Sequence, residues 1–153
     1  MKRIHYIGIL VVLILLTGVY LFSPFSPLNK VNVNGETMKL SSGYTVKNST
    51  GNSLTITNDT NELIIASTKS TGDLESSVSI YEEKVANNYN VTTSKLEMDS
   101  GQEVIKTIAK SKNSTLTITK YWFDHDGTIY EIQTDNAQEG TDNVVKDLIN
   151  SMK

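Results

Sequence analysis

The longest apolar segment lies at the start of the chain. Residues 4–22 contain no Asp, Glu, Lys or Arg. As a helix with about 1.5 Å of rise per residue, the segment would span about 28 Å, which matches the hydrocarbon core of a bilayer. Lys2 and Arg3 precede it with no acidic residue between. The positive-inside tendency therefore predicts one N-terminal transmembrane helix over residues 1–22, with a cytoplasmic N-terminus and the rest of the chain outside.

A cleaved signal peptide is the alternative interpretation of this segment, because both begin with cations followed by an apolar stretch. The stretch is longer than the usual core of a signal peptide, and residues 23–27 offer no A-x-A cleavage pattern. Both features favour an uncleaved anchor in the cell membrane, and the sequence leaves cleavage open. Pro24 and Pro27 indicate a short extended linker over residues 23–30. We expect an extracytoplasmic domain over residues 31–153.

Within this domain, short segments of strand-forming residues are separated by Asn, Asp, Gly and Ser. This pattern is typical of antiparallel strands joined by tight turns. Two of the turns carry Asn34-Gly35 and Asp126-Gly127, dipeptides that favour two-residue hairpins. The predicted strands cover residues 31–33, 37–40, 45–47, 53–57, 62–67, 91–98, 102–110, 116–123 and 128–132.

Helical spacing occurs twice in the domain. Between residues 73 and 89, large apolar residues recur every three or four positions, which predicts an amphipathic helix capped by Asp73 or Thr71. The same spacing from residue 144 to 152 predicts a final helix capped by Thr141. Five strands, a helix, four strands and a last helix, joined by short links, predict an α+β fold: a largely antiparallel sheet covered by two helices.

The only tryptophan lies in the run Tyr121-Trp122-Phe123. Because neighbouring strand residues face opposite sides of a sheet, Trp122 lies on the other face from its two aromatic neighbours. We favour a sheet covered on both faces, whereas an exposed Trp122 would mark a partner contact. The predicted core contains Leu63, Ile65, Val78, Val85, Ile105, Ile118, Tyr130, Leu148 and Ile149.

Composition excludes several kinds of chemistry. The chain has no cysteine, which rules out disulfides, thiol nucleophiles, zinc–thiolate sites and iron–sulfur clusters. From residue 31 onward, 11 lysines face 17 Asp and Glu residues; the net charge of about −6 disfavours nucleic acid as a partner. Phosphate-loop, dinucleotide-binding and G-x-S-x-G motifs are missing from the sequence. We therefore predict no cofactor and no enzymatic activity.

One short motif combines a histidine with carboxylates, at Asp124, His125 and Asp126. Such side chains bind divalent cations or act as a general base. Strand alternation, however, directs Asp124 and His125 to opposite faces, and a calcium loop needs about six or more oxygen ligands. We favour a polar hairpin tip, with no catalytic residue and no metal ligand assigned. The alternative is an envelope enzyme centred on His125, either metal-dependent or with a catalytic motif too weak to recognise.

Three segments together carry a distinctive set of turn and core residues. Residues 33–44 start at Val33-Asn34-Gly35 and end at Gly43-Tyr44. Residues 123–132 contain the pattern DG..Y.I, and residues 145–152 lie in the predicted final helix. This arrangement resembles the small, membrane-anchored PsbP-like proteins of methanogenic archaea, although Leu40-Ser41 stands where a proline is common. The resemblance implies an α/β/α sandwich and a binding or accessory role. The expected partners are the membrane, through residues 4–22, and a membrane or envelope protein. The resemblance transfers no functional residue to this chain.

Overall fold

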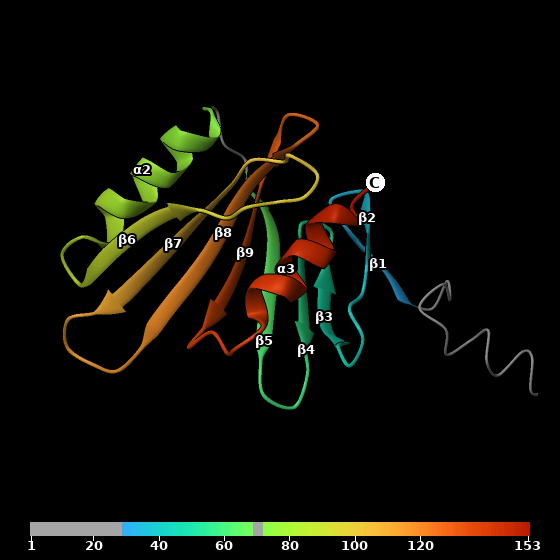
Figure 1. The fold of residues 1–153 in the computed structure, drawn as a ribbon, viewed down its shortest axis with the longest axis horizontal. Coiled ribbons are helices and arrows are strands. Elements are labelled where there is room, and N and C mark those ends of the chain that lie inside the picture. The colour runs from blue at the N-terminus through green and yellow to red at the C-terminus, as the bar shows by residue number, and fades with distance from the viewer. Residues whose placement is uncertain (1–28, 69–71) are drawn as a thin grey trace, which may run out of the picture. The chain divides into compact units, whose positions relative to one another are not determined.

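The computed structural model describes residues 29–68 and 72–153 (Figure 1). The anchor predicted over residues 4–22 lies outside this part of the chain. Within the described part, no helix combines the length and the apolar character needed to cross a membrane. Residues Val31–Lys153 form one compact unit.

The described elements follow the predicted order of five strands, a helix, four strands and a last helix. In chain order they are β1 (Lys30–Val33), β2 (Glu36–Lys39), β3 (Thr45–Thr50), β4 (Ser53–Thr57), β5 (Glu62–Thr68), α2 (Leu74–Val85), β6 (Tyr89–Lys95), β7 (Val104–Ser111), β8 (Thr117–His125), β9 (Thr128–Asp135) and α3 (Thr141–Asn150).

Seven strands form one antiparallel sheet in the order β3-β4-β5-β9-β8-β7-β6. The chain leaves β5 through α2 to reach the far edge at β6, then returns strand by strand until β9 pairs with β5. This return places β9 at the centre of the sheet. The strands β1 and β2 form a separate two-stranded sheet, a division that the sequence pattern did not predict.

Both predicted two-residue turns are present. The backbone φ angles are positive at Asn34 (54°) and Gly35 (90°) between β1 and β2, and at Asp126 (50°) and Gly127 (76°) between β8 and β9. Positive φ at both central residues is what a tight hairpin with right-handed strand twist requires. These two dipeptides therefore fix the register of the two hairpins.

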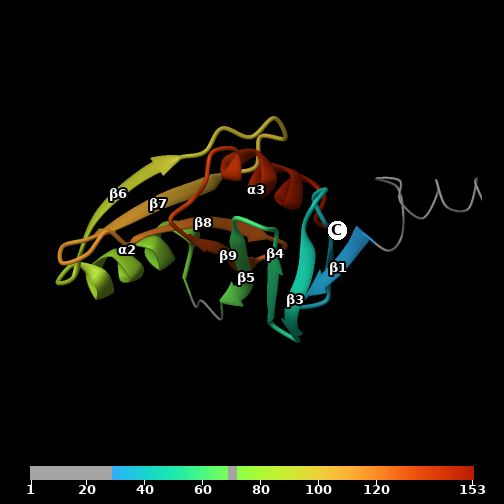
Figure 2. The same ribbon diagram turned by 90° about the horizontal axis from the view of Figure 1, so that it is seen from below.

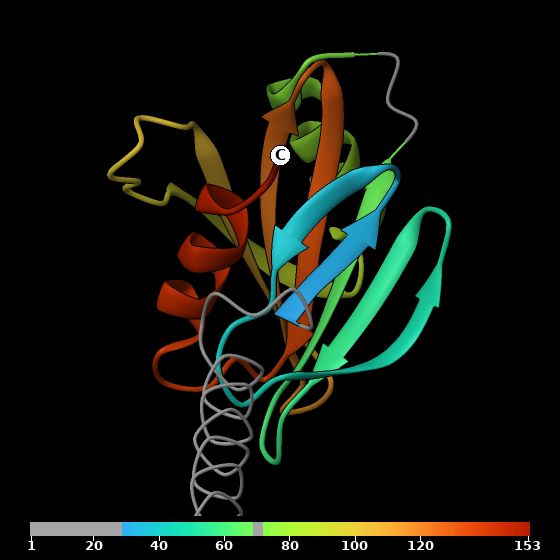
Figure 3. The same ribbon diagram turned by 90° about the vertical axis from the view of Figure 1, so that its right-hand side faces the viewer.

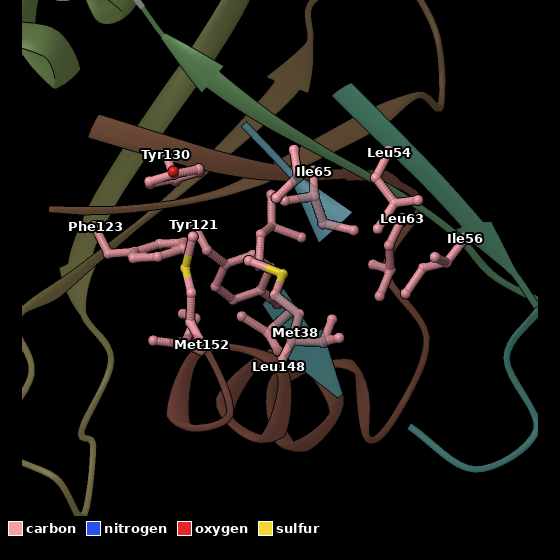
Figure 4. Close-up of a cluster of buried hydrophobic side chains, with 14 of the residues drawn as sticks. Met38, Leu54, Ile56, Leu63, Ile65, Tyr121, Phe123, Tyr130, Leu148 and Met152 are labelled. Atoms are coloured by element: carbon pink, nitrogen blue, oxygen red, sulfur yellow. The ribbon is translucent and has the colours of Figure 1, made fainter. Parts of the chain in front are cut away.

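The two helices cover opposite faces of the seven-stranded sheet (Figure 2). On the α3 face, residues of β4, β5, β8, β9 and α3 form the larger core, and Phe123 stacks on Tyr130 with ring centroids 5.5 Å apart (Figure 4). On the α2 face, a smaller cluster contains Leu74, Val78, Ile105, Trp122 and Ile129. The sheet therefore has a hydrophobic layer on each side, as in the predicted α+β fold.

The helix ends differ in part from the predicted ones. Asp73 caps α2, since its carboxylate accepts a hydrogen bond of 2.8 Å from the backbone N–H of Ser76. The prediction for α3 was wrong by one residue: the cap is Gly140 at φ 83°, and no side chain caps the helix. Thr141 is the first residue of α3, and its hydroxyl instead donates to the carbonyl of Gln138 at 2.7 Å.

The β1–β2 hairpin lies beside α3 and the C-terminus (Figure 3). Thr37 and Lys153 exchange two backbone hydrogen bonds, of 2.8 and 3.0 Å, and Ser151 Oγ accepts a bond of 2.8 Å from the N–H of Lys39. Val33 and Met38 of the hairpin are fully buried in the larger core. The end of the chain thus holds the hairpin against the α3 face.

Candidate functional site

A hollow of about 600 Å³ lies on the α3 face of the sheet, beside the start of α3. Its floor is formed by β7 and β8, which bend toward the side of the sheet on which α3 lies (Figure 2). One wall is the segment 136–143, which links β9 to α3 and includes the first turn of α3. We call this feature the α3 hollow.

Strand register selects the residues of the floor. Ile108 pairs with Thr119, and Lys106 pairs with Tyr121, so these side chains lie on one face. The wall adds the amides of Asn136, Gln138 and Asn143 and the carboxylates of Glu139 and Asp142. The polar lining without formal charge comes from Thr117, Thr119, Asn136, Gln138, Thr141 and Asn143. The α3 hollow therefore offers hydroxyl and amide groups around an aliphatic patch.

A charged pair stands at the inner side of the α3 hollow. Lys106 Nζ lies 2.7 and 2.8 Å from the two carboxylate oxygens of Asp142, and the Tyr121 hydroxyl donates a hydrogen bond of 2.5 Å to Oδ1 of the same carboxylate. Asp142 also lies in the first turn of α3, where the helix dipole favours a negative charge. The carboxylate is thus held by a cation, a phenol and a helix end.

These contacts set the protonation states of the group. Burial alone would raise the pKa of Asp142, but the hydrogen bonds from Lys106 and Tyr121 and the charges of Lys106 and Lys146 outweigh it and lower that pKa. The pKa of Tyr121 is raised far above its usual value by burial, by the hydrogen bond to Asp142 and by the negative charge of Asp142. At neutral pH the phenol keeps its proton, and the charges of Lys106 and Asp142 cancel.

A second hollow of about 570 Å³ lies between α2 and β6. Three of its polar side chains are engaged in local contacts: Lys112 Nζ donates to the carbonyl of Ala86 at 2.7 Å, and the Thr93 hydroxyl hydrogen-bonds Glu82. These bonds tie β6 and the following turn to the end of α2. Lys112, Thr93 and Glu82 therefore serve the fold at this second hollow.

In the structure, the side chain of Asp124 has different partners from those of His125 and Asp126. The carboxylate of Asp124 accepts a hydrogen bond of 2.9 Å from the N–H of Gly127 and so belongs to the turn itself. His125 Nε2 instead lies 3.7 Å from Oε2 of Glu36 at the start of β2, and the donor atoms of Glu36, His125 and Asp126 all lie within 4.8 Å of one another. Asp124 therefore does not join the cluster, and Glu36, which the sequence analysis did not select, does.

Trp122 is buried, with 4% of its surface exposed. Its indole N–H donates to the hydroxyl of Thr107 at 3.2 Å, and its ring lies 5.4 Å from the ring of Tyr81 on α2. Since α2 covers the indole, Trp122 lacks the exposure that a partner contact at this position would require. The favoured prediction of a sheet covered on both faces is confirmed at this position.

No protein-family model matches the sequence, and no curated protein matches it. Solved structures also match, among them the following two. A crystal structure from Bacteroides thetaiotaomicron VPI-5482 is 11% identical with a TM-score of 0.53, covering 82% of this chain and 47% of that one, so the chain spans about half its length. The solution structure of cyanobacterial PsbP (CyanoP) from Synechocystis sp. PCC 6803 is 10% identical with a TM-score of 0.46, covering 78% and 86%.

The first of these similarities supports the α+β fold and nothing beyond it. The TM-score of the second is too low to carry a conclusion. A mostly antiparallel sheet with a helix on each face is therefore established for the described residues by their own structure.

Proposed function

We propose that this chain is a membrane-anchored, extracytoplasmic PsbP-like protein that binds a partner in the cell envelope and catalyses no reaction itself. The apolar segment 4–22 with its flanking cations supports the anchor and its orientation. The turn and core motifs of residues 33–44, 123–132 and 145–152 support the PsbP-like assignment. The non-enzymatic role rests on the composition and motifs of the sequence.

The α3 hollow is the observation that carries the proposed binding role. Its volume of about 600 Å³ is in the size range of protein binding sites. Hydroxyl and amide groups surround the aliphatic side chain of Ile108, and the one ion pair of the lining, Lys106 with Asp142, is neutral as a whole, so the exposed carboxylate of Glu139 supplies the net charge of the lining. Such a lining, which repels anions through Glu139, suits a ligand that carries no negative charge and is rich in hydrogen-bonding groups. We propose an extended, uncharged peptide segment of an envelope protein as that ligand.

Two matched substitutions test the site. Ile108 is half-buried on the floor of the α3 hollow, whereas Ile64, which is 37% exposed, lies on the opposite face of the same sheet. Ile108→Glu places a charge and a longer side chain in the α3 hollow, and Ile64→Glu places the same group outside it. The readout is the amount of a stoichiometric partner that co-purifies with the full chain from native membranes.

We expect the Ile108→Glu variant to co-purify with at most about one tenth of the wild-type amount of partner. Burying an unpaired charge in the contact costs more than about 1.4 kcal/mol of binding free energy, which is a tenfold loss of affinity. The Ile64→Glu variant should retain the wild-type amount. Equal retention by both variants, or no stoichiometric partner for the wild type, contradicts the proposal. Far-UV circular dichroism of both variants confirms that each is folded.

The anchor is tested separately from the hollow. We expect the full chain to stay with membranes after an alkaline carbonate wash, and the domain after residue 30 to be cut by protease added outside intact cells. Release by the wash contradicts the anchor. Protection of the domain in intact cells, with digestion after lysis, contradicts the extracytoplasmic placement.

A further inference from the structure

Two hairpin tips that are far apart in the sequence meet on the α3 side of the sheet. Glu36 directly follows the Asn34-Gly35 turn of the β1–β2 hairpin, and His125 and Asp126 form one end of the β8–β9 turn. One donor atom from each of Glu36, His125 and Asp126 lies within 4.8 Å of the other two. We call these three residues the tip cluster.

The donor atoms of the tip cluster form no hydrogen bond among the described residues, and their one ion pair, between His125 and Glu36, is long. The 3.7 Å between His125 Nε2 and Glu36 Oε2 is too long for a hydrogen bond, whereas the Lys120–Glu131 and Lys106–Asp142 pairs close to 2.7 Å. Within residues 29–68 and 72–153, these three side chains form no other hydrogen bond or ion pair.

The side chains are also partly withdrawn from water. The exposed fraction of the side chain is 22% for His125 and 28% for Glu36, while Asp126 is exposed at the tip. The carboxylates of Glu36 and Asp126 both lie near the imidazole of His125. Where water is partly excluded, two such carboxylates repel each other unless a cation lies between them. Water still reaches the cluster past Asp126, so an ion has an entry path.

One imidazole nitrogen and two carboxylate oxygens form a ligand set that suits a first-row divalent cation such as Zn²⁺. Ligand atoms bound to one zinc ion at about 2.1 Å lie no more than about 4.2 Å apart, so separations up to 4.8 Å close by side-chain rotation. Ca²⁺ and Mg²⁺ prefer shells made of oxygen alone.

We propose that Glu36, His125 and Asp126 form a binding site for Zn²⁺ that joins the tip of the β1–β2 hairpin to the tip of the β8–β9 hairpin. The two carboxylates neutralise the charge of the ion, and the imidazole supplies its nitrogen ligand. The ion adds a link at the turn end of a hairpin that Thr37 and Lys153 already hold by backbone bonds. This site is independent of the α3 hollow and of the proposed partner.

The test is a titration of the full chain, freed of metal by a chelator, with Zn²⁺ alone, followed by calorimetry and by the midpoint of thermal unfolding. We expect one Zn²⁺ per chain and a rise of the midpoint, because a ligand that binds only the folded state stabilises it. Ca²⁺ and Mg²⁺ at the same concentration should bind at least about 10-fold more weakly.

Substitutions locate the site. His125→Ala and Glu36→Gln should each weaken Zn²⁺ binding at least about 10-fold, since even second-sphere partners of zinc ligands contribute about 10- to 100-fold. His5→Ala controls for the other histidine, and Glu103→Gln controls for an exposed carboxylate paired with Lys95; both should bind as the wild type does. Unchanged fluorescence of Trp122 shows that a variant is folded.

The proposal is overturned if Zn²⁺ does not bind with one-to-one stoichiometry, or if the folded His125→Ala variant binds it as tightly as the wild type. It is overturned as well if His5→Ala alone abolishes binding. None of these results bears on partner retention at the α3 hollow, so the two proposals fail separately.

Discussion

Asn61 Nδ2 lies 3.1 Å from the hydroxyl oxygen of Thr141, so the turn between β4 and β5 is joined directly to the first residue of α3. Asn61 is only 7% exposed. Its amide nitrogen also donates to the Tyr44 hydroxyl at 3.2 Å, and its carbonyl oxygen accepts from the Thr134 hydroxyl at 2.7 Å. A buried amide with these partners fixes the position at which α3 begins, and with it one wall of the α3 hollow.

Replacing the side-chain amide of Asn61 should lower the free energy of unfolding. Asn61→Leu removes the amide and leaves the hydroxyls of Tyr44, Thr134 and Thr141 without it, so we expect the free energy of unfolding to fall by about 1–3 kcal/mol. Asn87→Ala, at an exposed position after α2, should change it by less than about 0.5 kcal/mol. Equilibrium unfolding in urea measures both. Equal midpoints for the two variants would show that the network around Asn61 contributes little.

The residues of this network were not predictable from the sequence, because no local pattern links Tyr44, Asn61, Thr134 and Thr141. The order of strands and helices was predictable, because the two hairpin turns and the two helical periods are local signals. Two predicted core residues, Val85 and Ile118, are only half-buried. Val85 is the last residue of α2, which ends before the predicted Tyr89, so its side chain lies at the margin of the core.

Asp142 predicts a dependence of stability on pH. Its pKa in the folded protein is lowered from the ordinary 3.8, so its contribution to stability is present above that value and is lost as the pH falls through the folded pKa. We expect the stability difference between the wild type and Asp142→Asn to be largest above roughly pH 5 and to shrink at lower pH. Urea unfolding at a series of pH values measures it.

Lys106, which forms the ion pair with Asp142, provides the control for this prediction. Lys106→Met removes the cation that lies 2.7 Å from Asp142, so it should weaken the same dependence on pH while leaving the carboxylate in place. The interpretation fails if wild type and Asp142→Asn lose stability in parallel as the solution is acidified.

The ring and the hydroxyl of Tyr81 should contribute to stability in opposite ways. The ring packs 5.4 Å from Trp122, and Lys120 Nζ lies 4.8 Å from its centroid. The hydroxyl oxygen is buried and has no hydrogen-bond partner among the described residues. Burial of this group is the largest cause that raises the pKa of Tyr81, and the negative charge of Glu131 is the next largest.

We therefore expect Tyr81→Phe to leave the free energy of unfolding unchanged or to raise it by up to about 1 kcal/mol, because an unsatisfied buried hydroxyl is removed. Tyr81→Ala should lower it by about 1–3 kcal/mol and shift the emission of Trp122 to longer wavelength, since the cover of the indole is lost. Chemical unfolding followed by Trp122 fluorescence measures both effects. A Phe variant as unstable as the Ala variant would contradict the assigned role of the hydroxyl.

The two sites differ in what the sequence could reveal. His125 and Asp126 were visible as a local motif, but their partner Glu36 comes from another hairpin, and only the packing of β1–β2 against the α3 face brings it near. No pattern in the sequence predicted the α3 hollow. Its hydroxyl and amide residues are common throughout this chain, and their grouping depends on the register of β7 with β8 and on where α3 begins.

Gly140 is expected to set the start of α3 through its backbone. Its φ of 83° lies in the left-handed region, and no heavy atom beyond its two chain neighbours lies within 4 Å of where a Cβ would be added. Gly140→Ala should therefore lower the free energy of unfolding by about 1–2 kcal/mol through backbone strain alone. Gly140→Asn should cost less, because Asn tolerates this conformation better than Ala.

Gly51 provides the matched control for this prediction. It has the same open space around the Cβ position but no positive φ. Gly51→Ala should leave the free energy of unfolding unchanged or raise it by up to about 1 kcal/mol, because Ala restricts the unfolded chain. Urea unfolding of the three variants, with hydrogen exchange of the Asn143 amide that bonds the Gly140 carbonyl at 3.1 Å, measures the effect. If Gly140→Ala is as stable as Gly51→Ala and protects Asn143 equally, α3 begins independently of the conformation of residue 140.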